Sequence, residues 1–319
     1  MGIFAEIGEI IGLPLFAIEK DWWVVQTLRL IYQMDAAGHL LFKGGTSLNK
    51  AWKLIERFSE DIDLVLNREF LDFPEDISRS QVSKLRKASF DYLSNTFFTE
   101  LKKQFMESGI EDVKIQLGEI KSIDQDPLIF EIYYPAITEK SEYVEPKILV
   151  EIGSRSMSEP FTPKQISSMV GEHFAGQSFA DTPIEIPCVN PERTYLEKIF
   201  LLHEEFQRPA EKVRVNRLSR HLYDIYKISQ SEYAEKAIQD RKLFESIVRH
   251  REHFSKLSGV DYHSHFPPNL NPVPPEHLLK DWEQDYKTMQ QEMIYGESPS
   301  FKELIKSIER IVAGINNQK

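Results

Sequence analysis

Residues 42–48 read Phe42-Lys43-Gly44-Gly45-Thr46-Ser47-Leu48, and residues 57–64 read Arg57-Phe58-Ser59-Glu60-Asp61-Ile62-Asp63-Leu64. The first segment predicts a short apolar strand that passes through a Gly-Gly turn into a helix capped by Thr46 or Ser47. The second predicts a strand over residues 61–66, because apolar and polar residues partly alternate there. The chain is therefore expected to form a strand, a turn, a helix and a second strand in close succession.

The turn and the second strand together indicate a site for phosphate and metal. Glycines let a phosphate approach the backbone, N–H groups at a helix start point towards it, and the Thr46 and Ser47 hydroxyls can add donors. Asp61 and Asp63 lie two residues apart on a strand, so both side chains are expected on the same face. Adjacent carboxylates repel each other unless a cation bridges them, and Mg²⁺ prefers such oxygen ligands together with substrate phosphates. Either feature alone is more often structural, but their succession favours a functional site.

The pattern along the rest of the chain predicts an α+β domain over residues 1–188 and a helical domain over residues 189–319. Asn190 is expected to cap the first helix of the second domain, with Pro191 as its first residue. The expected helices are 17–36, 78–108, 191–207, 211–229, 234–257, 275–294 and 301–315, and the expected strands are 39–43, 61–66, 113–117, 129–134, 147–152 and 183–187.

The composition excludes several classes of protein. The 319 residues include 50 acidic and 39 basic side chains, a net charge of −11, which argues against a DNA-coating protein but permits a local basic groove. The single cysteine, Cys188, can form neither an internal disulfide nor a thiolate metal site, so a reducing cytoplasmic setting is expected. Apolar runs are too short for a transmembrane helix, so no membrane association is expected. The pair His263-Ser264-His265 lacks the further ligands that a zinc site needs.

The order of the motifs resembles a known family. Gly44-Gly45-Thr46-Ser47 followed by Asp61-Ile62-Asp63 resembles the signature of the nucleotidyltransferase fold shared with DNA polymerase β. The longer string FKGGTSLNKAW, followed by RFSEDIDL, is closer still to the AbiEii/AbiGii toxin branch of that superfamily, whose N-terminal helix also resembles residues 18–22. The resemblance covers residues 18–228. It implies a polymerase β-like nucleotidyltransferase domain with a mixed sheet, followed by the helical domain, in the toxin half of a type IV toxin–antitoxin or abortive-infection system.

The resemblance also implies the functional residues. Glu151 is the candidate for a third carboxylate, and Glu131 is the competing choice. Asp224 matches an aspartate in the family's final motif, whereas His221 stands where some relatives have aspartate. The implied catalytic residues are Asp61, Asp63, Glu151, Lys198 and Asp224; the implied nucleotide-binding residues are Lys43, Gly44, Gly45, Thr46, Ser47, Arg57 and Lys198; and the implied metal ligands are Asp61, Asp63 and Glu151.

Some of these residues have plain structural alternatives. Lys198 fits a solvated helix face, and Asp224 fits an ion pair with Arg220 four residues earlier. Basic residues are also concentrated between Arg208 and Arg220, where Arg214, Arg217 and Arg220 would form a partial stripe on a helix. Such a stripe suits either a triphosphate or an RNA backbone, or is simply a solvated face.

These observations predict a Mg²⁺-dependent enzyme that transfers a nucleoside monophosphate from a nucleoside triphosphate to RNA, with tRNA as the expected acceptor and an antitoxin as partner. Two alternatives stay open. The same fold can act on a hydroxyl of a small molecule or a protein, in which case the helical domain would close over a small pocket. The chain can also be a non-catalytic nucleotide- or antitoxin-binding module, although such a module has no need of paired carboxylates at a phosphate turn.

Overall fold

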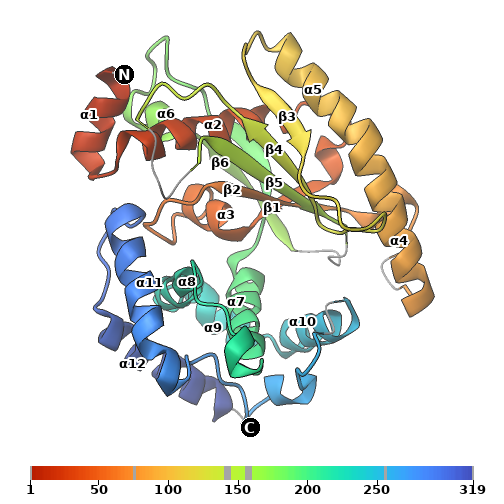
Figure 1. Ribbon diagram of the computed structural model, residues 1–319, viewed down its shortest axis with the longest axis vertical. Coiled ribbons are helices and arrows are strands. Elements are labelled where there is room, and N and C mark those ends of the chain that lie inside the picture. The colour runs from red at the N-terminus through yellow and green to blue at the C-terminus, as the bar shows by residue number, and fades with distance from the viewer. Residues whose placement is uncertain (1, 75–76, 140–144, 155–159, 255–256, 318–319) are drawn as a thin grey trace. The chain divides into compact units, whose positions relative to one another are not determined.

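The computed structural model describes residues 2–74, 77–139, 145–154, 160–254 and 257–317. The chain divides into two compact units, the first formed by residues 1–53 and 58–189 and the second by residues 54–57 and 190–319 (Figure 1). The first unit contains a seven-stranded mixed sheet and the second is built from helices. The predicted α+β fold with C-terminal helices is therefore confirmed.

The strands of the first unit lie in the order β3-β4-β5-β2-β1-β7-β6. β2 pairs in parallel with β5 and antiparallel with β1, so the sheet is mixed at its centre. The strands are β1 (Leu40–Lys43), β2 (Asp61–Leu66), β3 (Lys114–Leu117), β4 (Leu128–Tyr133), β5 (Lys147–Gly153), β6 (Phe161–Ile166) and β7 (Ile184–Val189).

One face of this sheet carries the main core of the unit. Buried side chains alternate along β4 and β5, and those of Phe130 and Val150 pack in one cluster with residues of α2 (Leu15–Ile31) and α5 (Phe98–Glu107). The opposite face carries the half-buried polar residues of β2, β4 and β5. The sheet is therefore apolar towards its helices and polar on its other side, as expected from period-2 alternation. The further helices are α1 (Gly2–Ile11), α3 (Gly44–Lys50), α4 (Arg79–Asp91), the π-helix η3 (Tyr92–Phe97) and α6 (Met169–His173).

Three consecutive charged residues of α2 are buried, and each has a partner. Glu19 accepts hydrogen bonds from the backbone N–H groups of Ile137 and Thr138 at 2.8 and 3.1 Å. Lys20 pairs with Glu60 at 2.5 Å, immediately before β2. Asp21 pairs with Lys50 on α3 and accepts a 2.7 Å bond from Met169 N. Because unpaired buried charges are strongly unfavourable, these partners fix α2 against α3, α6 and the start of β2.

The larger part of the second unit begins at Asn190, and Pro191 is the first residue of α7, as predicted. Trp282, Tyr286 and Leu304 are fully buried within this unit. Its helices are α7 (Pro191–Phe206), α8 (Ser219–Ile228), α9 (Glu232–Gln239), α10 (Arg241–Phe254), α11 (Leu279–Glu292) and α12 (Phe301–Asn316).

The structure differs from the expected elements in several places, and the expected helix 17–36 ends at Ile31. β6 was not predicted, and Pro163 within it lies opposite Pro187 of β7. The expected helix 78–108 contains the π-helical turn η3. The expected helix 211–229 is divided into the 3₁₀ helix η4 (Ala210–Lys212) and α8. The Asp285 carboxylate accepts hydrogen bonds from Arg217 N and Ser219 N and so fixes the start of α8 at Ser219. The expected helix 234–257 is interrupted between α9 and α10, and its residues 255 and 256 lie outside the described residues.

Candidate active site

The Gly-Gly turn and the second strand meet at Gly44 and Asp63. Gly44 has φ +78°, a left-handed conformation that suits glycine. A Cβ atom placed on Gly44 would lie 2.8 Å from Cγ of Asp63 and overlap its carboxylate. The turn therefore lies directly against one of the three predicted metal ligands, and only glycine leaves room for this approach.

Strand register brings the predicted carboxylates to one face of the sheet. Asp63 pairs with Lys43 of β1 on one side and with Glu151 of β5 on the other. Asp61 lies two residues before Asp63 and therefore shares that face. All four side chains are half-buried, whereas Ile62 between the two aspartates is buried in the core. The predicted third carboxylate is thus a direct strand neighbour of Asp63.

Two predicted hydroxyl donors are buried inside the first unit. Thr46 is buried, and its Oγ1 bonds to Ser59 Oγ at 3.0 Å and donates to the backbone oxygen of Asp61. Ser47 is also buried and lies beside the Cys188 thiol, whose pKa burial raises to about 12. The Thr46 hydroxyl therefore joins α3 to the start of β2, whereas the Ser47 hydroxyl is buried beside Cys188 of β7 with no hydrogen-bond partner among the described residues. Because both hydroxyls are buried, backbone N–H groups are left as the donors of this turn towards a ligand.

The donor chemistry fits Mg²⁺ when substrate phosphates complete the coordination. Asp61 and Asp63 supply two hard oxygen ligands on one face of β2, and Mg²⁺ usually takes only one or two protein carboxylates. Across the described ranges, no group of three or more His, Cys, Asp or Glu side chains is arranged to hold a metal. Asp61 and Asp63, together with phosphate oxygens of a nucleotide, would supply ligands of the kind that Mg²⁺ prefers.

Glu131, the competing choice for the third carboxylate, has other partners. It accepts hydrogen bonds from Gln116 Nε2 at 2.8 Å and Tyr133 Oη at 2.9 Å, and lies 3.4 Å from Lys147 Nζ. The bond from Gln116, helped by Tyr133 and Lys147, lowers the pKa of Glu131 despite partial desolvation. In register, Glu131 is separated from Asp61 by Leu149, whereas Glu151 is next to Asp63. Strand position therefore favours Glu151.

The second unit contains a buried cluster around Asp224. Arg57 donates to both carboxylate oxygens of Asp224, at 2.7 and 2.8 Å, and Lys198 Nζ lies 2.8 Å from Oδ2. Burial would raise the pKa of Asp224, but the charges of Arg57 and Lys198 and their hydrogen bonds hold it well below its usual range. Arg57, Lys198 and Asp224 are thus brought together, and Asp224 pairs with two cations that lie outside α8.

His221 lies next to this cluster, with Nδ1 3.5 Å from Lys198 Nζ. Burial, followed by the positive charges of Lys198 and Arg220, lowers the pKa of His221 well below its usual value. Burial also lowers the pKa of Lys198, against the opposing effect of Asp224. His221 is therefore a neutral neighbour of Lys198.

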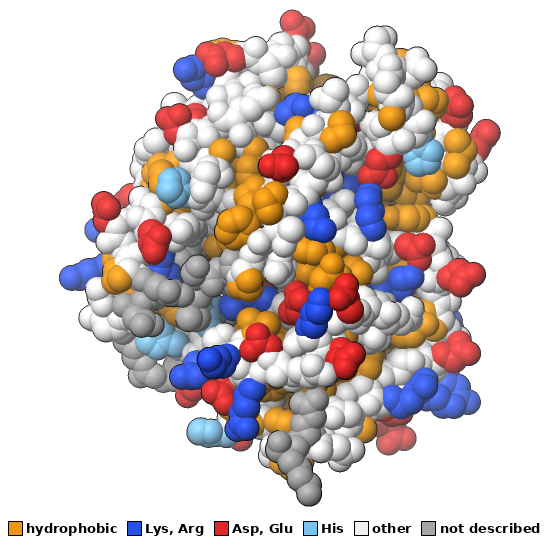
Figure 2. Space-filling view, turned by 180° about the vertical axis from the view of Figure 1, so that it is seen from behind, with side chains coloured by type: hydrophobic (Ala, Val, Ile, Leu, Met, Phe, Trp, Pro, Cys, Tyr) orange, Lys and Arg blue, Asp and Glu red, His pale blue; other side chains and the backbone are white. Residues whose placement is uncertain are grey.

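The expected basic stripe does not form. Arg214 and Arg217 precede α8, and Arg217 has φ +62°. Glu205 binds both Arg208, at 3.0 Å, and Arg214, at 2.7 Å, so one buried acid neutralises much of this positive charge. On the surface shown in Figure 2, acidic and basic side chains are interspersed rather than gathered by sign.

The histidine pair His263 and His265 is structural in part. His265 is fully buried, and its Nε2 lies 3.1 Å from Glu204, which also binds Arg251.

Among the described residues, no helix has the length and apolar character needed to cross a bilayer.

The buried pairs of α2 were not predicted, although a signal was present. Lys20 binds the residue before Asp61, and Asp21 binds Lys50 on the helix that follows Gly44. Three adjacent charged residues in an otherwise apolar helix span too wide an arc to share one solvated face. That arrangement could have indicated buried partners, but it could not have identified them.

Comparison with known proteins identifies the family. The family model for the nucleotidyl transferase AbiEii toxin of type IV toxin–antitoxin systems matches residues 28–311. The crystal structure of JHP933 from Helicobacter pylori is similar, with 14% sequence identity over 95% of this chain and 93% of that chain, and a TM-score of 0.44. No curated protein matches the sequence. The family match spans most of the chain, and this protein belongs to the AbiEii family of nucleotidyl transferase toxins of type IV toxin–antitoxin systems.

Proposed function

We propose that this toxin transfers a nucleoside monophosphate from a nucleoside triphosphate to RNA, with tRNA as acceptor, in a Mg²⁺-dependent reaction. The observation that carries the catalytic part is the packing of Gly44 against the Asp63 carboxylate, which is itself next to Glu151 in the sheet. A phosphate-binding turn and a pair of carboxylates are thereby combined at one place. Support for an RNA acceptor comes from the resemblance to the family, and an antitoxin partner follows from the family itself.

The residues of the first unit are assigned by their chemistry. Backbone N–H groups at Gly44, Gly45, Thr46 and Ser47 bind the triphosphate, with Lys43 beside them. Asp61 and Asp63 hold Mg²⁺, with Glu151 as third carboxylate, and the bound ion supplies charge stabilisation to the phosphates. In the reaction an acceptor hydroxyl oxygen forms a bond to the α-phosphorus. The bond from that phosphorus to the bridging oxygen breaks, pyrophosphate leaves, and Glu151 accepts the hydroxyl proton.

The charged cluster of the second unit is assigned a supporting role. Lys198 neutralises phosphate charge as pyrophosphate leaves, and Asp224 orients Lys198 through their 2.8 Å contact. Arg57 holds Asp224 by two hydrogen bonds and so fixes the position of this carboxylate.

The test incubates the purified protein with Mg²⁺, total tRNA and each α-³²P-labelled nucleoside triphosphate in turn. Wild type should label RNA, and Asp63→Ala should lower labelling at least 100-fold while the fold is retained. Glu107→Ala, at the end of α5, serves as the control for loss of an acidic side chain and should stay active. Label on a protein or on a small molecule instead of RNA would show that RNA is not the acceptor. Labelling that survives Asp63→Ala would refute the catalytic assignment.

A further inference from the structure

The sheet face that carries the carboxylates also carries an aromatic residue between two lysines. Register pairs Lys114 of β3 with Tyr133 of β4, and Tyr133 with Lys147 of β5. The next positions of the same face are Gln116, Glu131, Leu149 and Asp61, in that order across four strands. Tyr133 therefore lies two residues along the strands from these four residues, which is a distance on the order of 7 Å.

The Tyr133 ring is held in place by its own hydroxyl. Tyr133 Oη donates to Glu131 at 2.9 Å, and Gln116 holds the same carboxylate at 2.8 Å. The bond to Glu131 raises the pKa of Tyr133, so the phenol stays neutral near pH 7. The side chain is only half-buried, and the ring's orientation is fixed before any ligand binds.

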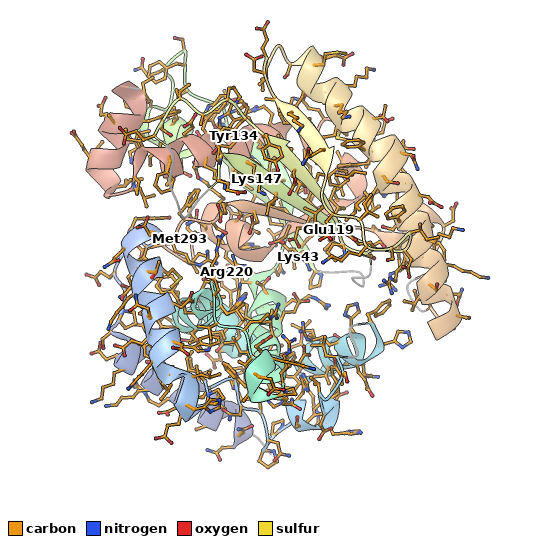
Figure 3. The ribbon with its side chains drawn as sticks, in the orientation of Figure 1. Lys43, Glu119, Tyr134, Lys147, Arg220 and Met293 are labelled. Atoms are coloured by element: carbon orange, nitrogen blue, oxygen red, sulfur yellow. The ribbon has the colours of Figure 1, made fainter. Side chains whose placement is uncertain are left out.

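A lysine from each neighbouring strand lies over the ring, and one of them, Lys147, is 3.4 Å from the Glu131 carboxylate. Lys114 Nζ lies 5.8 Å from the ring centroid and Lys147 Nζ lies 5.6 Å from it. Lys114 is exposed, and Lys147 also pairs with Glu145 at 2.7 Å, at the start of β5 where Figure 3 labels it. An aromatic ring on a sheet face, with lysines beside it, is the arrangement with which sheet proteins stack a single-stranded base and bind the adjacent phosphates.

We infer that Tyr133 is a stacking platform for a base of single-stranded RNA, and that Lys114 and Lys147 bind the phosphates on either side of that base. This inference rests on the proposed function, because it supplies a binding surface for the RNA acceptor on the face where the carboxylates lie. A cross-strand ladder that only stabilised the sheet would also join these residues, but it would contribute nothing to RNA affinity.

The test measures binding of a fluorescein-labelled, 12-nucleotide single-stranded RNA of mixed sequence by anisotropy at several salt concentrations. Tyr133→Leu should weaken binding by roughly 5- to 100-fold, because one stacked base is lost. Tyr133→Phe keeps the ring and should bind within about twofold of wild type. Lys114→Ala/Lys147→Ala should reduce the slope of log affinity against log salt by about 1.4. Lys102→Ala is the matched control, since Lys102 Nζ lies 4.2 Å from the centroid of the Phe98 ring on α5. This variant should change neither the RNA affinity nor its dependence on salt.

Unchanged RNA affinity in Tyr133→Leu, with the native circular dichroism spectrum, would overturn the inference. Should that variant fail to fold, the double lysine variant decides, and an unchanged salt slope would overturn the inference. The proposed function fails separately. If wild type and Tyr133→Leu label RNA equally and have the same KM for RNA, the stacking platform is wrong but the proposed function stands. If RNA binds through Tyr133 but is never labelled, the assignment of RNA as acceptor is wrong but the stacking platform stands.

Discussion

The Cα atom of Gly44 lies against the carboxylate of Asp63, and no space remains between them for a side chain. The two residues are separated by α3 and the segment before β2, so this contact joins the turn and the carboxylate pair into one structural element. Its geometry explains why the order of these motifs is more informative than either motif alone.

Gly44→Ala should therefore abolish most nucleotide transfer. The added methyl group displaces the Asp63 carboxylate, and a shift of about 1 Å at a reacting group can reduce a rate about 100-fold. The positive φ at Gly44 adds a stability loss of about 1–2 kcal/mol. Gly109→Ala is the matched control, because Gly109 has φ +72° but nothing within 4 Å of its added Cβ. Equal activity losses in the two variants, measured by nucleotide transfer and urea unfolding, would contradict this explanation.

Lys20→Met should destabilise the protein strongly. The variant leaves Glu60 buried without its 2.5 Å partner, and breaking a buried pair in this way costs about 3–5 kcal/mol. Lys20→Met/Glu60→Met removes both charges and should recover much of that loss. Lys121→Met is the control, because the Lys121–Glu119 pair at 3.5 Å is exposed and contributes less than about 1 kcal/mol. Urea unfolding at pH 7 measures the stability of all three variants. A double variant less stable than Lys20→Met would contradict the explanation that the loss comes from the broken Lys20–Glu60 pair.

Asp224→Asn should lower stability most at neutral pH. The substitution removes the anion that Arg57 and Lys198 share in a buried site, at a cost of about 3–5 kcal/mol. The native pKa of Asp224 lies below the ordinary 3.8, so the unfolded chain takes up the proton first as pH falls. The stability that Asp224 contributes is thus complete above about pH 4 and is lost below it. The difference in unfolding free energy between wild type and variant should be constant at pH 7, 5 and 4 and should narrow at pH 3 and below. A difference that stays constant below pH 4 would show that the carboxylate's charge is not responsible.

His203 should make stability fall between about pH 6.5 and pH 4. Its burial, with a smaller effect of His265, lowers its pKa from 6.5 to about 4. The unfolded chain therefore binds a proton in this range that the native protein does not, which costs about 3 kcal/mol across the full window. His203→Gln should flatten this part of the profile. His263→Gln serves as the control, since His263 is exposed, and a wild-type slope in His203→Gln would refute the assignment.

The sequence predicted the central elements of the fold because their signals are local. β1, α3 and β2 follow from an apolar run, a Gly-Gly turn and a partly alternating segment within a short stretch of chain. β6 lacked such a signal, because Pro163 interrupts a mostly polar segment that is ordered by pairing with β7. The helix expected from residue 211 failed for a similar reason, since Asp285 on α11 determines where α8 begins.

The candidate site was predictable as a set of residue types and not as a set of contacts. Spacing alone placed Asp61 and Asp63 on one face, but the neighbour of Asp63 depends on which strand pairs with β2. The partner of Arg57 lies 167 residues further along the chain, and no local pattern relates the two. The hydrogen bond from the buried Thr46 hydroxyl to the Asp61 backbone oxygen likewise depends on tertiary structure, and no local pattern predicts it.

Residues 54–57 have a consequence for how this protein can be divided. They belong to the helical unit, although α3 before them and β2 after them belong to the first unit. The helical unit is therefore discontinuous in the gene, and a fragment of residues 190–319 would lack both Arg57, which holds Asp224, and Glu56, which pairs with Lys227 at 2.6 Å. A single crossover between two related genes cannot transfer this unit whole, so its two parts must be inherited together for the charged cluster to stay complete.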